Sequence, residues 1–94
     1  MPEETSAQKL VKVYDSMKAV SIEKNKRYGD SALNPAKVFS KVDATTSILI
    51  RLDDKLNRVK NSDTLRKNDV SDVIGYLALL CVAQGWLDFS DQID

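Results

Sequence analysis

The chain has 94 residues, and its 14 basic and 14 acidic side chains leave no net charge. This length suits one compact domain and excludes two, and the balanced charge does not favour a nucleic acid polymer or an anionic membrane as a partner. No apolar run approaches the roughly 20 residues of a membrane span, so we expect a cytoplasmic protein, and the absence of histidine removes the commonest general base and metal ligand.

A first helix is expected between a capping box at Thr5 and about Lys24. Thr5 and Gln8, three residues apart, match the capping-box pattern in which each side chain bonds the backbone of the other. The apolar residues that follow recur at helical spacing, namely Leu10, Val13, Tyr14, Met17 and Val20. Residues 25–35 should then form a loop, because Gly29 permits positive φ and Pro35 disfavours helix in the residue before it.

Pro35 can open a short helix that runs through Phe39. Asp43 or Thr45 can cap a longer helix that ends near Asn61 and has an apolar stripe, namely Ile48, Leu49, Leu52, Leu56 and Val59. The sequence therefore predicts two further helices before the last one.

A last helix is expected to begin at Asp63 or Thr64 and to reach about Gln84. From Val70 to Val82 it is apolar almost all round, so we expect it to be central or shared between subunits. The sequence thus predicts an all-α fold for residues 1–94, a small oligomeric bundle of three longer helices and one short helix. We expect poorly ordered tails at residues 1–5 and 88–94.

Charged residues on the last two helices are placed to form an ionic cluster. Arg51, Asp54, Lys55 and Arg58 lie at i, i+3, i+4 and i+7, which puts them on one stripe of a helix. We expect Asp72 of the last helix to face Arg51, Lys55 or Arg58 and to fix helix register or help to hold a ligand. The alternative is a set of exposed pairs worth about 0.2–0.5 kcal/mol each.

The segment of residues 24–31 gathers cations and an aromatic ring around a glycine. Tyr28 can stack on a nucleobase while cations meet phosphate, namely Lys24, Lys26 and Arg27. Ser31 can add a hydroxyl donor. The alternative is an ordinary solvated helix end.

A metal site is a rival interpretation of the acidic residues. Four carboxylates on two helices could share a Mg²⁺ ion, namely Asp53, Asp54, Asp69 and Asp72. Lys55 and Arg58 would compete with the metal for these carboxylates.

Three motifs occur in order: Lys-x-x-x-Tyr-Gly-Asp-Ser at residues 24–31, Arg-x-x-Asp-Lys-x-x-Arg at residues 51–58, and Asn-Asp-x-x-Asp-x-Ile-Gly-Tyr at residues 68–76. Together they resemble a family of small, mostly phage-encoded helical proteins, the nucleotide modification associated domain. That family is similar in turn to the MazG-type all-α nucleoside triphosphate pyrophosphohydrolases, which hold Mg²⁺ with Glu-Glu-x-x-Glu and Glu-x-x-Asp motifs. Asp69 and Asp72 could stand for the second motif, whereas Asn57 breaks the first.

The resemblance implies a nucleotide-binding protein of phage type, and the broken acidic motif argues against hydrolysis. We therefore expect a homo-oligomer, a dimer or tetramer, that sequesters a cyclic nucleotide or related defence signal without a cofactor, in the cytoplasm of a bacterial host. The expected ligand contacts are Lys24, Lys26, Arg27, Tyr28, Ser31, Arg51, Lys55, Arg58 and Tyr14, with Asp54 and Asp72 orienting the cations. The alternatives are a Mg²⁺-dependent nucleotide pyrophosphohydrolase and a non-catalytic helical interaction module.

Overall fold

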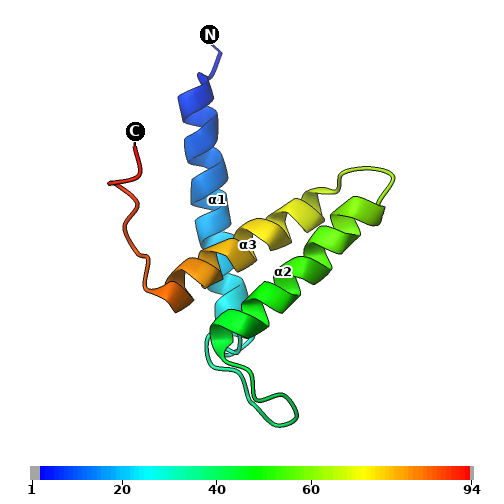
Figure 1. The fold of residues 1–94 in the computed structure, drawn as a ribbon. Coiled ribbons are helices and arrows are strands. Elements are labelled where there is room, and N and C mark those ends of the chain that lie inside the picture. The colour runs from blue at the N-terminus through cyan, green and yellow to red at the C-terminus, as the bar shows by residue number, and fades with distance from the viewer. Residues whose placement is uncertain (1–2, 94) are drawn as a thin grey trace.

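The computed structural model describes residues 3–93, which fold into three α-helices and contain no strand. These helices are α1 (Ser6–Arg27), α2 (Ala44–Asn61) and α3 (Lys67–Gln84) (Figure 1). The prediction of an all-α fold with three longer helices is therefore confirmed.

The starts of α1 and α2 and the end of α3 form close to where the sequence predicts them. The capping box of α1 is complete, because the Gln8 backbone N–H donates to Thr5 Oγ1 at 3.1 Å and the Thr5 N–H donates to Gln8 Oε1 at 2.7 Å. Asp43 caps α2 by accepting a 2.8 Å hydrogen bond from the Thr46 N–H. Helix α3 ends at Gly85, whose φ of 77° is the left-handed conformation that glycine adopts without a Cβ penalty.

Three boundaries differ from the prediction. The short helix expected from Pro35 does not form, and residues 35–42 are a loop in which Lys37 has a φ of 56°, a value that no right-handed helix accommodates. Helix α1 continues three residues beyond Lys24, to Arg27. Helix α3 begins at Lys67 and not at Asp63 or Thr64, because the Ser62 hydroxyl bonds the Thr64 carbonyl at 2.7 Å and holds a turn there.

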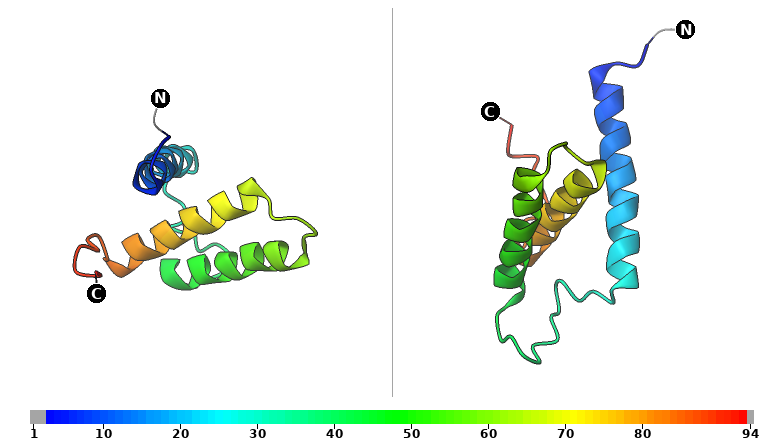
Figure 2. Two further views of the ribbon diagram at one scale, coloured as in Figure 1. Left: turned by 90° about the horizontal axis from the view of Figure 1, so that it is seen from above. Right: turned by 90° about the vertical axis from the view of Figure 1, so that its right-hand side faces the viewer.

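Helices α2 and α3 form an antiparallel hairpin, and α1 packs against α3 but not against α2. Two further views show α1 crossing the hairpin on the side of α3, with the N-terminal half of α1 projecting beyond it (Figure 2). The three helices therefore do not form a closed bundle within one chain.

The hydrophobic core of the described residues is small. Among them Ile48 is fully buried and Leu52 is 7% exposed, and no other apolar side chain is classed as buried. The radius of gyration is 15.6 Å, whereas a compact chain of this length is expected to have about 12 Å. Much of the apolar surface thus faces outward.

Within residues 3–93 no helix combines the length and hydropathy of a membrane span. The expected N-terminal tail includes residues 1 and 2, and the expected C-terminal tail includes residue 94; these three lie outside the described residues. Glu4 pairs with Lys12 at 2.6 Å, and residues 88–93 are exposed and non-helical.

Candidate functional site

A cavity of about 700 Å³ lies where the end of α1, the loop that follows it, the start of α2 and the middle of α3 meet. Its volume falls within the range of roughly 300–1,000 Å³ that is typical of small-molecule sites. The polar side chains that line it are Ser21, Lys24, Asn25, Tyr28, Ser31, Ser47, Arg51, Lys55, Asn68, Asp72 and Tyr76. Ile48, Leu79, Pro35, Ala32, Ala36 and Gly75 complete the lining.

Helix α1 contributes one stripe of side chains to this cavity. Ser21, Lys24, Asn25 and Tyr28 lie at i, i+3, i+4 and i+7, which places them on one face of the helix. Asn25 also ties down the loop, because its amide donates to Asp30 Oδ1 at 3.0 Å. The wall formed by α1 and its loop is therefore held by local hydrogen bonds.

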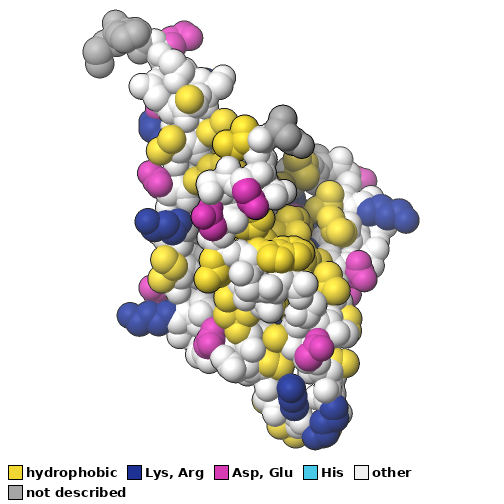
Figure 3. All heavy atoms as spheres, turned by 60° about the vertical axis from the view of Figure 1, so that its left-hand side comes forward, with side chains coloured by type: hydrophobic (Ala, Val, Ile, Leu, Met, Phe, Trp, Pro, Cys, Tyr) yellow, Lys and Arg dark blue, Asp and Glu magenta, His cyan; other side chains and the backbone are white. Residues whose placement is uncertain are grey.

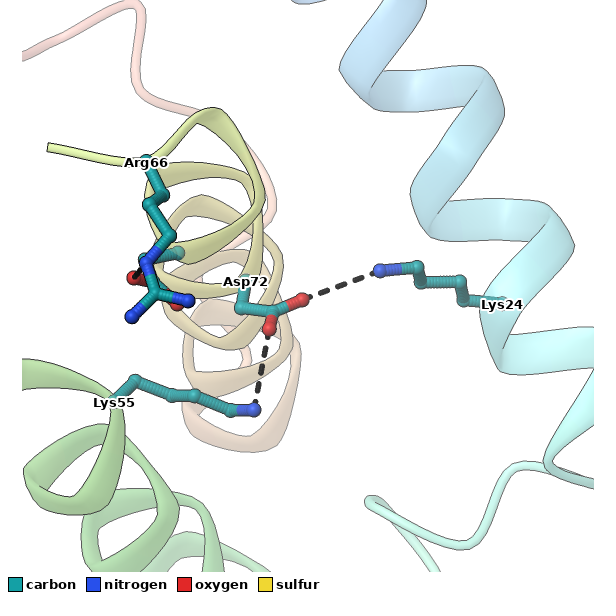
Figure 4. Close-up of polar contacts among 5 residues, drawn as sticks. Lys24, Lys55, Arg66 and Asp72 are labelled. Atoms are coloured by element: carbon teal, nitrogen blue, oxygen red, sulfur yellow. Dashed lines mark hydrogen bonds and ion pairs between the residues drawn. The ribbon is translucent and has the colours of Figure 1, made fainter. Parts of the chain in front are cut away.

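Asp72 joins all three helices at the cavity. Its carboxylate lies 3.1 Å from Lys55 Nζ of α2 and 3.2 Å from Lys24 Nζ of α1, one lysine on each oxygen (Figure 4). The side chains of Asp72 and Lys55 are 14% and 19% exposed, so water screens this pair only partly. The predicted contact between Asp72 and a cation of α2 is confirmed for Lys55. Asp72 also pairs with Lys24 of α1, a helix that was not expected to contribute to the ionic cluster.

The lysines lower the pKa of Asp72. Partial burial alone would raise the pKa of this carboxyl, but hydrogen bonds and charge attraction from Lys55 and Lys24 outweigh it, so the net shift is downward. Asp72 is therefore ionised at neutral pH and holds the two ammonium groups in place.

The cavity has more positive than negative groups. Three cations line it, Lys24, Arg51 and Lys55, against the single carboxylate of Asp72. Asp72 neutralises one lysine, and within residues 3–93 Arg51 has no ion-pair partner. The described lining thus has an excess of two positive charges, which suits an anion.

Gly75 gives the cavity a stretch of bare helix backbone. It lies inside α3 and does not have the positive φ that requires glycine. A Cβ built at this position meets no heavy atom within 4 Å, so packing against other side chains does not require glycine either. The space in front of Gly75 belongs to the cavity, where a flat group could approach the backbone closely.

The structure gathers some of the predicted ligand residues in the cavity and not others. Those that line it are Lys24, Tyr28, Ser31, Arg51, Lys55 and Asp72. Those that do not are Lys26, Arg27, Arg58, Tyr14 and Asp54. Because α1 continues to Arg27, helical geometry turns Lys26 to the side opposite Lys24, and Arg27 pairs with Glu23 at 3.0 Å.

Several residues line the cavity that were not among the predicted ligand contacts. Ser21 precedes Lys24 by three residues and could have been found by extending the helical stripe toward the N-terminus. Asn68, Gly75 and Tyr76 belong to the third motif but had no predicted role in ligand binding.

The four candidate metal ligands are not brought together. In the described part of the chain, no group of three or more His, Cys, Asp or Glu side chains is placed to hold a metal ion. Asp53 and Asp54 are exposed. Asp69 is 5% exposed, its Oδ2 accepts no hydrogen bond, and the Arg66 guanidinium lies 3.8 Å away.

No protein-family model matches this chain, and no curated protein or solved structure is significantly similar to it. The resemblance to the nucleotide modification associated domain thus depends on the three motifs alone.

Proposed function

We propose that the chain binds a phosphorylated nucleoside in this cavity and sequesters it without hydrolysis. The strongest support is that three cations line one cavity of about 700 Å³ together with a single carboxylate, Asp72. Lys24 comes from α1, and Arg51 and Lys55 come from α2. As the motifs suggest, the natural ligand would be a cyclic nucleotide or a related defence signal. The chain would then be an anti-defence protein of a phage, acting in the cytoplasm of its bacterial host.

Arg51 is the group best suited to meet the phosphate. It has no ion-pair partner within residues 3–93, so an incoming anion displaces no carboxylate from it. A guanidinium can bond two phosphate oxygens at once, and each charge-assisted bond is stronger than a neutral one. Lys24, 46% exposed and held by Asp72, can add a second positive charge.

Other residues of the lining suit a heterocycle. Tyr28, Tyr76 and Leu79 line the same cavity as the cations, so it also has aromatic and apolar side chains. Stacking on an aromatic ring contributes about 1–3 kcal/mol per base and tolerates any base. This combination favours a nucleotide over inorganic phosphate or a simple sugar phosphate.

The arrangement around Asp72 favours binding over metal-dependent hydrolysis. Each oxygen of Asp72 already forms an ion pair with a lysine ammonium group, so a divalent cation would have to displace a lysine. One observation favours the hydrolytic alternative: Asp69, one turn before Asp72, has a buried carboxylate oxygen without a hydrogen bond. That alternative predicts pyrophosphate release from a nucleoside triphosphate with Mg²⁺, abolished by EDTA and by Asp72→Ala.

We also propose that the chain acts as a homo-oligomer, a dimer or tetramer, and that its partner molecules are small nucleotides and not nucleic acid polymers or membranes. The small core and the large radius of gyration support self-association. Under the remaining alternative, a helical interaction module, the same apolar surface would bind an unrelated protein and the cavity would stay empty.

Isothermal titration with mono-, cyclic di- and cyclic trinucleotides tests the proposed function. Arg51→Ala should weaken the tightest ligand by about 10- to 150-fold, because losing hydrogen bonds to a charged group costs about 1.5–3 kcal/mol. Arg27→Ala is the matched control: it also removes an exposed arginine, but one outside the cavity, and should leave affinity unchanged. If every nucleotide tried binds more weakly than millimolar, the proposal is wrong.

A further inference from the structure

We propose that a second copy of the chain covers an apolar corner formed by the N-terminal half of α1 and the outer side of α3. The residues that define this corner are Leu10, Val13, Tyr14, Val70 and Leu77, all exposed within one chain. The proposal specifies the surface through which the proposed oligomer forms. The five residues of the corner do not line the cavity, so this proposal does not depend on nucleotide binding.

On α1 the corner is a charge-free stripe. Leu10, Val13 and Tyr14 are 58%, 51% and 73% exposed. At about 100° per residue they lie within one arc of the helix, while Lys12 and Asp15 lie on the other side. In a monomer this stripe would face water.

On α3 the corner is the side opposite the cavity. Val70 and Leu77, 36% and 47% exposed, are seven residues apart and therefore lie on one side of the helix. Asp72 and Leu79 line the cavity from the other side. Helix α3 therefore exposes apolar side chains on the side that faces away from the cavity, as expected of a helix that packs against another subunit.

The two surfaces meet at an angle. Figure 1 shows the N-terminal half of α1 rising beyond α3, so that the two helices meet at an angle there. The space-filling view shows hydrophobic side chains gathered in the hollow beside α1 (Figure 3). Three exposed apolar side chains follow the end of α3, namely Trp86, Leu87 and Phe89.

The amount of exposed surface favours a second copy as the occupant. The chain exposes 7,928 Å², whereas a compact monomer of 10.5 kDa should expose about 5,400 Å². The excess of about 2,500 Å², summed over the whole chain, exceeds the roughly 800 Å² that each partner buries in a standard interface, so the chain has enough surplus surface for a homodimer interface that includes the corner. A two-fold axis would cover the same corner on both chains at once.

The mass in solution tests this inference. Light scattering coupled to size-exclusion chromatography should give the wild-type chain at least twice the 10.5 kDa of one copy at micromolar concentration. Leu10→Glu and Leu77→Glu should each shift the mass toward one copy, because a charge buried at the interface is left unpaired. Leu65→Glu is the control, since Leu65 is 74% exposed but lies in the loop between α2 and α3. A wild-type monomer, or a dimer that both corner variants leave intact, would overturn the inference.

A second measurement uses the wild-type chain and requires no substitution. Cys81, the only cysteine of the chain, lies four residues after Leu77 on the same side of α3 and is half-buried in one chain. If the corner is an interface, the reaction of Cys81 with a thiol reagent should be slow at high protein concentration and should accelerate on dilution. A rate that does not depend on protein concentration across the transition in mass would contradict the proposed surface.

Discussion

Replacing Gly75 with alanine should stabilise the fold and weaken the ligand at the same time. A glycine inside a helix costs about 0.8–1.0 kcal/mol relative to alanine. The new methyl group meets no protein atom within 4 Å, so nothing in the chain should oppose that gain. A gain of about 1 kcal/mol corresponds to a rise in Tm of about 4–8 °C for a chain of this size.

The same methyl group would enter the space that we assign to the nucleotide. Crowding a filled site typically costs about 1–3 kcal/mol, so affinity should fall about 5- to 150-fold. Thermal unfolding, with wild type and variant at one protein concentration, measures the first effect, and isothermal titration measures the second. The opposite signs are diagnostic, because a variant that is merely misfolded would lose both stability and affinity.

Asn57→Ala is the control for Gly75→Ala. Asn57 is an exposed position inside α2 that does not line the cavity, so alanine should raise Tm slightly and leave affinity unchanged. If Gly75→Ala raises Tm but binds the nucleotide as tightly as the wild-type chain, the ligand does not approach the backbone of α3. If it lowers Tm, the space in front of Gly75 is not open.

Three further predictions concern the polar contacts. Asp72→Asn should lower the free energy of unfolding at neutral pH by about 1–3 kcal/mol, because two lysines lose the negative charge that they share and one of them loses its acceptor oxygen. Since the pKa of Asp72 is lowered on folding, its contribution is fully present above the ordinary value of 3.8 and is lost as the pH falls below it, so urea unfolding of the variant should depend less on pH in that range. Lys55→Met should destabilise more than Lys24→Met in the same assay, since Lys55 is 19% exposed and Lys24 is 46% exposed. Thr5→Ala should cost about 0.5–2 kcal/mol and should speed hydrogen exchange in the first turn of α1; unchanged exchange would mean that the capping box contributes nothing.

The parts of the fold that the sequence predicted correctly depend on interactions between near neighbours. The caps at Thr5 and Asp43 join residues three apart, so the pattern of residue types placed the first cap and narrowed the second to Asp43 or Thr45. The short helix after Pro35 was wrong because a favourable first residue does not specify the next turn, and Lys37 adopts a left-handed conformation there. The start of α3 could not be predicted because it depends on a hydrogen bond from the Ser62 hydroxyl to the Thr64 carbonyl. The sequence is equally compatible with other hydrogen bonds in this turn.

The candidate site was predictable where helical periodicity alone decides which residues share a face. The pairing of Asp72 with Lys55 follows from two stripes on neighbouring helices. The contribution of Lys24 required knowing how α1 crosses α3, which no local pattern specifies. Lys26 and Arg27 were grouped with Lys24 because residues 25–35 were expected to be a loop, and one more turn of helix directs their side chains away from the cavity.

The most direct test of the account is a crystal structure of the chain saturated with the tightest-binding nucleotide. We predict that a phosphate oxygen lies within hydrogen-bonding distance of the Arg51 guanidinium and that the base lies between Tyr28 and the backbone at Gly75. A nucleotide bound instead on the outer side of α1, against Lys26 and Arg27, with the cavity holding only water, would contradict the account.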